Sequence, residues 1–231
     1  MNILALETST ELCSAALWLD GKVDAREVVA GQRNSELLLP MVDALLTANK
    51  MIPRDLDGIA FGAGPGAFTG VRIACGVAQG IAFGIDVPVA AIGTLMALAE
   101  AARAPRVVCC LDARMGEVYH AAYERRDGRW HELHAPGLYK PAAVPALPAG
   151  KWSGCGSGFA AFRDELSARY AGSIDRVIDG VAPHARDIAT LAALKFERGE
   201  AIDAAEALPL YVRDKVALKV DERERLNGVS K

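Results

Sequence analysis

The sequence has no block of lysine and arginine residues, and its formal net charge is −3 over 231 residues. Tight nucleic-acid binding needs clustered cationic side chains that neutralise phosphates, so the chain alone is a poor candidate for it. Long apolar runs are also missing: the longest, Val71 to Ile85, includes Arg72 and Gln79 and is too short to span a bilayer. The N-terminal segment MNILALETST lacks the basic part of a signal peptide. We therefore expect no membrane partner.

The sequence has few cysteines, and their number is odd. The five cysteines include the neighbours Cys109 and Cys110 in an apolar stretch, which suits a buried strand better than a disulfide framework. This usage predicts a reduced, cytoplasmic protein. The chain is instead rich in apolar residues: 52% are hydrophobic, and the mean hydropathy is +0.16. This composition is sufficient for a sizeable core and argues against a disordered chain.

The hydrophobic pattern predicts two halves of similar order. The first half reads as strands at 3–8, 12–19 and 23–30, a helix at 35–48, a strand at 56–63, a helix at 69–84, a strand at 87–92 and a helix at 95–103. After Ala104-Pro105 the pattern restarts, with strands at 106–111, 118–123 and 130–134 and helices at 159–170 and 185–198. Each half opens with strand, turn, strand, Asp-Gly turn and strand, which indicates a diverged internal duplication.

These halves give the expected division of the chain. We assign residues 1–104 to a first lobe, 105–208 to a second, smaller lobe, and 209–231 to a C-terminal segment that packs back on the first lobe. The charged tail from Asp221 is expected to be loose.

The glycine-rich stretch FGAGPGAFTGVRIACG raises the question of a phosphate loop. It lacks the Lys-Ser/Thr ending of a Walker A motif, and the bulky Phe68 and Pro65 argue against a dinucleotide fingerprint. The following helix instead carries two strips of small residues, one at 66, 70, 74, 78 and 82 and one at 76, 80 and 84. Each interior glycine costs a helix about 0.8–1 kcal/mol relative to alanine, which close approach of another element can offset.

The two strips favour a protein interface. One strip is explained by packing on the chain's own sheet, and the second is better explained by a partner, although intramolecular packing alone stays an alternative. The preceding helix has its own apolar stripe, and two such helices side by side from each of two molecules would form a four-helix interface. Arg72 either binds a carboxylate there or extends into solvent. The expected interface residues are Leu38, Met41, Val42, Leu45, Thr69, Arg72, Ile73, Gly76, Gly80 and Phe83.

Several motifs together resemble one family. The order of elements is similar to the actin-like ATPase superfold, and ILALETST, NSELLLPMVDALL, GAGPGAFTGVRIACGVAQGIAFG, LDARMGEVYHAAY and PLYVR are similar to the TsaB family, also called YeaZ. The resemblance implies an α/β fold of two actin-like (ribonuclease H-like) lobes, each a mixed sheet flanked by helices. Asn34 departs from the family, which often has histidine there.

The resemblance also implies a function. TsaB-like proteins are expected to bind TsaD, with the ATPase TsaE joining them, to make threonylcarbamoyladenosine (t6A) at position 37 of tRNAs that read ANN codons. They are expected to be non-catalytic, to form homodimers through the same first-lobe helices when TsaD is absent, and to meet tRNA only indirectly. No cofactor is expected in the chain itself, while ATP or ADP is expected in the complex.

The residues give little reason to expect catalysis by the chain alone. The superfold holds phosphates between two hairpins, and the candidate residual nucleotide-binding residues are Glu7, Thr8, Ser9, Asp112, Gly156 and Gly158. Arg114 and Met115 stand where the second hairpin needs small residues, so half of the clamp is missing. We expect no catalytic residue and no metal site, since His131 and His134 alternate sides of a strand at this spacing and fit solvated hairpin positions.

Two alternatives stay open. One is an autonomous ATP-dependent kinase or glycoprotease-like hydrolase of the same superfold, for which Glu7 and Asp112 would be essential. The other is direct tRNA binding through Arg125, Arg126 and Arg129, for which solvated hairpin charge is the simpler interpretation.

Overall fold

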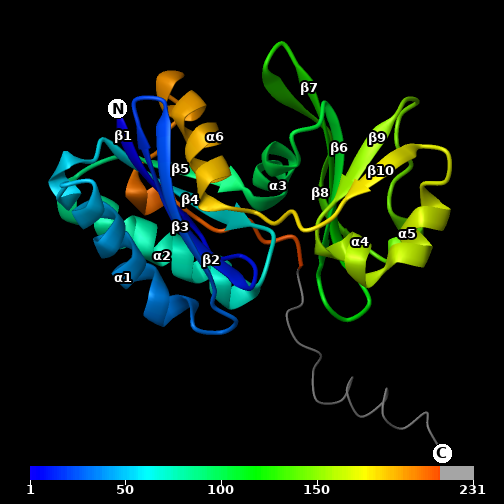
Figure 1. The fold of residues 1–231 in the computed structure, drawn as a ribbon, viewed down its shortest axis with the longest axis horizontal. Coiled ribbons are helices and arrows are strands. Elements are labelled where there is room, and N and C mark those ends of the chain that lie inside the picture. Colours follow the sequence, from blue (N-terminus) through cyan, green and yellow to red (C-terminus); the bar gives the residue numbers. More distant parts are fainter. Residues whose placement is uncertain (214–231) are drawn as a thin grey trace, which may run out of the picture.

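Two five-stranded sheets form the framework of the protein (Figure 1), described here over residues 1–213 of a computed structural model. The first sheet has the order β3-β2-β1-β4-β5. Its strands are β1 (Asn2–Glu7), β2 (Leu12–Leu19), β3 (Lys22–Val29), β4 (Gly58–Gly64) and β5 (Val89–Gly93). The first three strands are antiparallel, whereas β4 pairs parallel to β1 and β5 parallel to β4, so the sheet is mixed. The Asp20-Gly21 turn joins β2 to β3 with positive φ at both residues, as predicted.

The second sheet repeats this order. Its order β8-β7-β6-β9-β10 matches β3-β2-β1-β4-β5 strand for strand, again with three antiparallel strands followed by two parallel ones. The strands are β6 (Arg106–Asp112), β7 (Val118–Arg126), β8 (Arg129–Tyr139), β9 (Trp152–Cys155) and β10 (Ile174–Ile178). The duplication predicted from the order of elements is therefore present, and so is the α/β fold of two mixed sheets flanked by helices.

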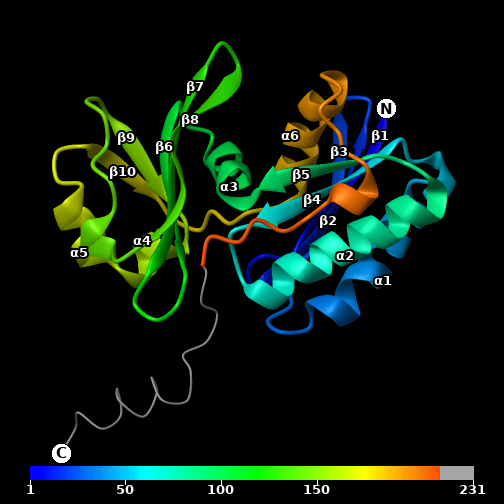
Figure 2. The same cartoon turned by 180° about the vertical axis from the view of Figure 1, so that it is seen from behind.

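Helices cover both faces of the first sheet (Figures 1 and 2). On one face lie α1 (Asn34–Ala48) and α2 (Phe68–Ile85), packed against a core that includes Leu4 and Leu6 of β1. On the other face lies α6 (Ala185–Glu197), packed against the alternate residues Ile3 and Ala5. Burial on both faces explains why β1 is almost continuously apolar.

The second sheet is covered in the same way. One face packs on α4 (Ser157–Ala161) and α5 (Arg163–Arg169), which replace the single helix predicted for 159–170. The other face packs on α3 (Thr94–Ala102), which lies between the lobes in Figure 1. Three short 3₁₀ turns, Pro53–Asp55, Pro141–Ala143 and Ala204–Glu206, complete the elements.

The helices α3 and α6 do not pack on the lobes to which residues 1–104 and 105–208 were assigned. The first-half helix α3 completes the core of the second lobe, while the late helix α6 completes the core of the first. The sequence cannot show this exchange, because an apolar helix face marks burial but not the sheet that buries it.

The chain stays on the first lobe after α6 (Figure 2). Ile202 pairs with Val89 of β5, and the amide N–H of Leu210 donates to the carbonyl of Ala63 at 2.7 Å. Gln79 of α2 donates to the carbonyls of Ala204 and Ala207, both at 3.0 Å. The segment 209–213 thus packs on the first lobe, whereas the expectations for 214–231, including the tail from residue 221, lie outside the described residues.

Candidate functional site

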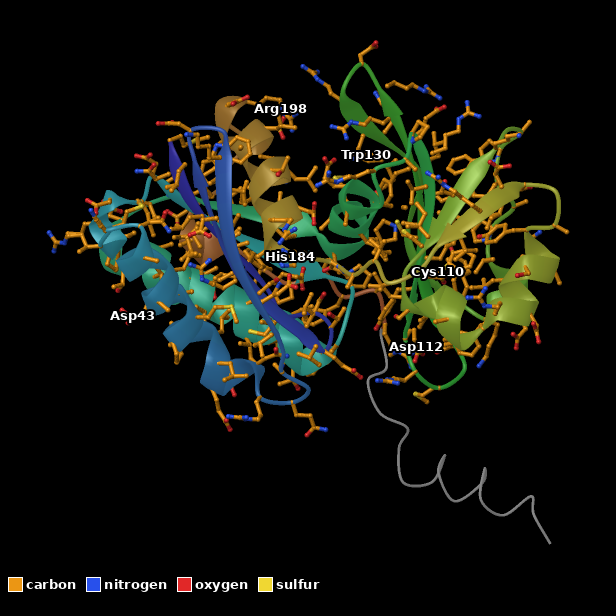
Figure 3. The ribbon with its side chains drawn as sticks, viewed as in Figure 1. Asp43, Cys110, Asp112, Trp130, His184 and Arg198 are labelled. Carbon is orange, nitrogen blue, oxygen red and sulfur yellow. The ribbon has the colours of Figure 1, made fainter. Side chains whose placement is uncertain are left out.

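A cleft with a volume of about 1680 Å³ lies between the lobes. The first wall includes Ser9 and the start of α2, and the second wall includes Asp112 and the turn that follows it. Asp112 is labelled in Figure 3. The two hairpins expected to hold phosphates therefore do face one cavity. The question is whether their side chains are free to bind a ligand.

The first hairpin is held by its own hydrogen bonds. Glu7 is fully buried, and burial raises the pKa of its carboxyl, partly opposed by the N–H of Ser9, which donates to Oε1 at 2.5 Å. Oε2 has no hydrogen-bond partner among the described residues. The Thr8 hydroxyl donates to the Gly70 carbonyl at 2.7 Å and is occupied within the fold.

The glycines of the loop between β4 and α2 pack against this hairpin. A Cβ added at Gly62 would lie 1.9 Å from Oε2 of Glu7, and one added at Gly70 would lie 1.9 Å from the Thr8 carbonyl oxygen. At Gly66 the Cβ would approach that of Ser9 to 2.6 Å. These glycines are required by close backbone approach inside the first lobe, which accounts for the motif without a bound phosphate.

The second hairpin is filled by its own side chains. The Asp112 carboxylate accepts from the backbone N–H of Arg114 at 2.8 Å and from its guanidinium at 3.2 Å. Arg114 and Met115 both have positive φ, and Arg114 reaches across the cleft to Glu11 at 3.3 Å. The carboxylate that a nucleotide site would use is therefore paired within the turn.

Gly156 and Gly158 also serve packing. An added Cβ would lie 2.4 Å from the Cys110 carbonyl oxygen at Gly156 and 2.8 Å from the Cys110 Cβ at Gly158. Both glycines let the start of α4 approach β6 closely. Within residues 1–213, no group of three histidine, cysteine, aspartate or glutamate side chains is arranged to hold a metal ion.

The two strips of α2 have different environments. Gly70, Ala74, Ala78 and Ala82 are buried against the first sheet. A Cβ added at Gly76, Gly80 or Gly84 would meet nothing within 4 Å, so this second strip is uncovered by the described part of the chain. Phe83 beside it is 60% exposed, and Thr69 and Arg72 are also exposed. We call Thr69, Arg72, Gly76, Gly80, Phe83 and Gly84 the open face of α2.

The predicted contribution of α1 to this face is wrong in part. Leu38 and Leu45 are fully buried and Val42 is 5% exposed, because the apolar stripe of α1 packs on the chain's own first sheet. Met41 and Ile73 are half-buried against the same core. The stripe that suggested a partner is the intramolecular contact that holds α1.

The helix α2 as a whole has the length and composition of a membrane-spanning segment but packs on a folded lobe. By these two criteria alone α2 is apolar enough to cross a membrane, with a mean hydropathy of 1.4 over 18 residues. In the structure one strip packs on the sheet and Gln79 is bonded to the returning chain. We therefore treat α2 as a surface helix with one uncovered side.

Arg72 is exposed, as one of the two alternatives expected, but its guanidinium also contacts two aromatic side chains, and the expected pairing with a partner carboxylate stays a prediction. Its guanidinium carbon lies 3.9 Å from the centroid of the Phe68 ring, and its Nε donates to the Tyr211 hydroxyl at 2.7 Å. The sequence did not reveal this cluster because Tyr211 lies 139 residues after Arg72 in the chain. The PLYVR motif, which contains Tyr211, was the available signal.

The sequence did not predict that His120 and His134 would lie side by side. His134 lies beside His120 with ring centroids 5.6 Å apart, so it is not a solvated hairpin residue, whereas His131 is exposed. Burial lowers the pKa of His120 to about 3, and both its ring nitrogens lack a partner among the described residues. Irregular pairing of β7 with β8 near these residues changes the side-chain alternation that the prediction assumed.

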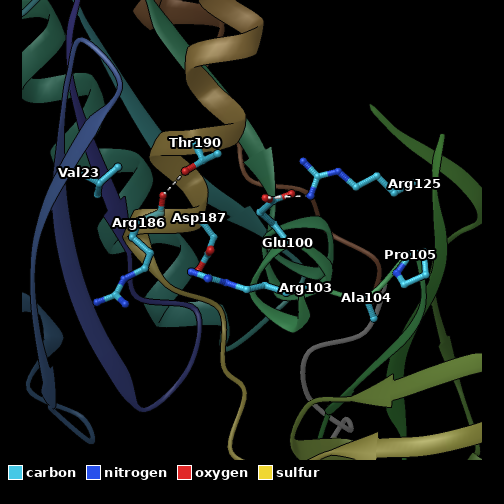
Figure 4. A pocket seen from close by; sticks show the side chains of 9 residues that line it. All are labelled: Val23, Glu100, Arg103, Ala104, Pro105, Arg125, Arg186, Asp187 and Thr190. Carbon is cyan, nitrogen blue, oxygen red and sulfur yellow. Dashed lines mark hydrogen bonds and ion pairs between the residues drawn. The ribbon is translucent and has the colours of Figure 1, made fainter. Parts of the chain in front are cut away.

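A second cavity of about 690 Å³ lies where α3, α6 and β7 meet (Figure 4). Arg125 is bonded to Glu100 at 3.3 Å, and the Trp130 indole donates to the same carboxylate at 2.6 Å. Burial raises the pKa of Asp187 to about 6, and Figure 4 shows the Arg103 guanidinium pointing toward it. Arg125 therefore belongs to an interlobe charge cluster and is not an isolated basic side chain of the hairpin.

The fold and the cleft together define the class of protein: an α/β chain of two actin-like lobes. A family model described as TsaD, tRNA N6-adenosine threonylcarbamoyltransferase, matches residues 28–219. The chain is 38% identical to the tRNA threonylcarbamoyladenosine biosynthesis protein TsaB of Escherichia coli K12, over 95% of this chain and 97% of that protein. The chain thus belongs to the TsaB family.

Other comparisons agree with this assignment. A solved structure of YeaZ from Pseudomonas aeruginosa has a TM-score of 0.84 and 39% identity, covering 91% of this chain and 99% of that one. A tRNA N6-adenosine threonylcarbamoyltransferase of Chlorobaculum tepidum is 33% identical over 103 residues, which cover 38% of this chain and 29% of that protein.

Proposed function

We propose that the chain is a non-catalytic subunit in the biosynthesis of t6A in tRNA, and that it docks on the transferase TsaD through the open face of α2. The family assignment supports the role in t6A biosynthesis. The single observation that carries the docking surface is the uncovered strip at Gly76, Gly80 and Gly84. The two glycines in the helix interior, Gly76 and Gly80, together cost the helix about 2 kcal/mol relative to alanine, which a closely packed partner helix offsets.

The state of the cleft supports the non-catalytic role. Asp112 is paired with Arg114, and the glycines expected near a nucleotide serve packing inside each lobe. A chain in this state stabilises an active arrangement of its partner without contributing reacting groups. The same open face serves a homodimer when the transferase is absent, so the two assemblies compete for it.

The docking surface is tested by filling the strip. Gly76→Leu and Gly80→Leu place a bulky side chain where a partner backbone approaches, so we expect binding to purified TsaD to weaken at least tenfold by isothermal titration calorimetry. Ala168→Leu, on the exposed side of α5, is the matched control and should leave the affinity unchanged. Unchanged affinity in both glycine variants would refute the proposed surface.

A smaller substitution separates folding from assembly. Gly76→Ala adds one methyl group into open space on the single chain, so it should raise the stability of the monomer by about 0.8–1 kcal/mol in urea unfolding at concentrations too low for the homodimer to form. The same variant should bind TsaD no better than the parent. A fall in stability would mean that the position is covered in the isolated chain.

The remaining features of the complex are further proposals, and light scattering tests whether the homodimer and the heterodimer share one surface. We propose that TsaE joins the pair, that ATP or ADP is bound only in the assembled complex, that the chain meets tRNA only indirectly, and that the assembly is cytoplasmic. Light scattering of the chain alone and with TsaD, with and without ATP, should show a homodimer replaced by a heterodimer. Persistence of the homodimer beside the complex would contradict a shared surface.

A further inference from the structure

The segment 208–213, which we call the strap, connects the two lobes along the cleft. At its first-lobe end the Leu210 amide donates to the Ala63 carbonyl at 2.7 Å. At its second-lobe end the Arg213 guanidinium donates to the Ala113 carbonyl at 3.0 Å and pairs with Glu117 at 2.9 Å. Residues 210–213 also line the cleft itself. The strap therefore bridges β4 of one lobe and the β6–β7 turn of the other.

The strap also reaches the open face of α2. Tyr211 accepts a hydrogen bond from Nε of Arg72 at 2.7 Å, and its ring lies 5.7 Å from that of Phe68. Arg72 is exposed, and within residues 1–213 its terminal guanidinium nitrogens have no hydrogen-bond partner. One side chain thus belongs both to the strap contacts and to the proposed docking surface.

We propose that the strap couples docking on α2 to the width of the interlobe cleft, and that a carboxylate side chain of the partner acts on Arg72 to release Tyr211. The coupling rests on the proposed function for the identity of the partner. A carboxylate binds two guanidinium N–H groups in a planar, charge-assisted pair, a stronger interaction than a single bond to a neutral hydroxyl. A partner carboxylate that pairs side-on with Nε and one terminal nitrogen of Arg72 takes the Nε–H away from Tyr211, and this loosens the first-lobe end of the strap.

The coupling must act in both directions. If docking favours the released strap, then weakening the strap must favour docking by the same factor, because the two equilibria are linked. Each hydrogen bond removed from the strap should change the balance between held and released states by about two- to tenfold. A strap that only holds the lobes together would respond to the loss of a hydrogen bond without any matching change in the affinity for the partner. Measuring both the released population and the affinity therefore tests the coupling.

The first measurement uses the chain alone. Spin labels at Asp43→Cys on α1 and Glu165→Cys on α5 report the distance between the lobes, and selective labelling is favoured because all five native cysteines are buried. Tyr211→Phe and Arg213→Gln should broaden the distance distribution toward wider separations. Tyr119→Phe in the same cleft and the surface variant Arg163→Gln are controls that should match the parent.

A conservative substitution keeps this result decisive. Tyr211→Phe removes a single hydroxyl and should leave the melting temperature within a few degrees, so its distances report the strap and not unfolding. A distribution identical to that of the controls in both variants would overturn the strap as an interlobe connection.

The second measurement adds TsaD. Forming the complex should shift the interlobe distance of the parent, and Tyr211→Phe should raise the affinity by the factor by which it raised the released population. Altered distances with unchanged affinity would overturn the coupling alone. Absence of any complex would overturn the proposed function together with the coupling, and the distances in the free chain would still stand.

Discussion

At the scale of single residues, Glu7 shows how a position that resembles a catalytic acid serves the fold. Its carboxylate is enclosed between the first hairpin and Gly62, and one oxygen lacks a partner among residues 1–213. Burial raises the pKa of this carboxyl, so the folded chain holds the proton more tightly than the unfolded chain does. The stability that the protonated form contributes is present at low pH and is lost as pH rises from about 4.5 through the raised folded value.

Glu7→Gln tests this interpretation directly. The amide keeps the acceptor for the Ser9 N–H and removes a buried charge, so we expect a stability gain of about 1–3 kcal/mol at pH 7 that shrinks toward pH 4. Urea unfolding at the two pH values measures it. The autonomous-enzyme alternative predicts instead that Glu7→Gln abolishes ATP turnover or hydrolysis, so a parent rate that disappears in the variant would favour that alternative.

Residue-level prediction from the sequence succeeded where the neighbours are local. The tight Asp-Gly turns depend only on adjacent residues and have the expected positive φ values. The Arg72–Tyr211 contact and the fit of Gly70 against Thr8 depend on residues far apart in the chain. Spacing in one sequence carries no information on which distant residues meet.

At the scale of elements, the periodicity of hydrophobic residues predicted the helices and most strands. It did not predict which elements pack against one another. Both small-residue strips of α2 were predicted from spacing, and one is buried while the other is open. The stripe of α1 was assigned to a partner although it packs on the sheet, because an apolar face indicates burial without naming what buries it. The strands β9 and β10 were not predicted, since β9 is short and glycine-containing and β10 is only half-buried.

The strand β7 carries the buried His120, which makes the second lobe sensitive to acid. The folded pKa is depressed to about 3 from 6.5, so only the unfolded chain takes up this proton as pH falls below 6.5. Stability should therefore drop by about 2 kcal/mol between pH 6.5 and pH 5 from this residue.

Comparison of two variants isolates this effect. His120→Leu should flatten the dependence of the urea midpoint on pH, while the exposed His131→Gln should leave it as in the parent. His134, whose pKa burial also lowers, accounts for a smaller remaining slope. An equal slope in parent and His120→Leu would show that the histidine is protonated in the folded state.

At the scale of the whole molecule, the exchange of α3 and α6 makes the two lobes interdependent. The first sheet needs α6 to cover Ile3, Ala5 and Ala60, and the second sheet needs α3 to cover Val107 and Cys109. A fragment of residues 1–104 lacks α6 and exposes apolar faces on both β1 and α3.

We therefore expect this fragment not to fold on its own. Compared with the full chain, it should bind a hydrophobic dye, elute as aggregates in gel filtration and show no cooperative urea transition by circular dichroism. A cooperative transition of the monomeric fragment would contradict the interdependence and restore the boundary expected at residue 104.

The late position of α6 has a consequence for how the protein is made. All strands of the first sheet are synthesised before residues 94–184, and the helix that shields one side of that sheet comes only after them. During this interval the nascent chain carries an unshielded apolar β-surface. We therefore expect chains whose synthesis stops before residue 185 to keep this surface exposed and to aggregate.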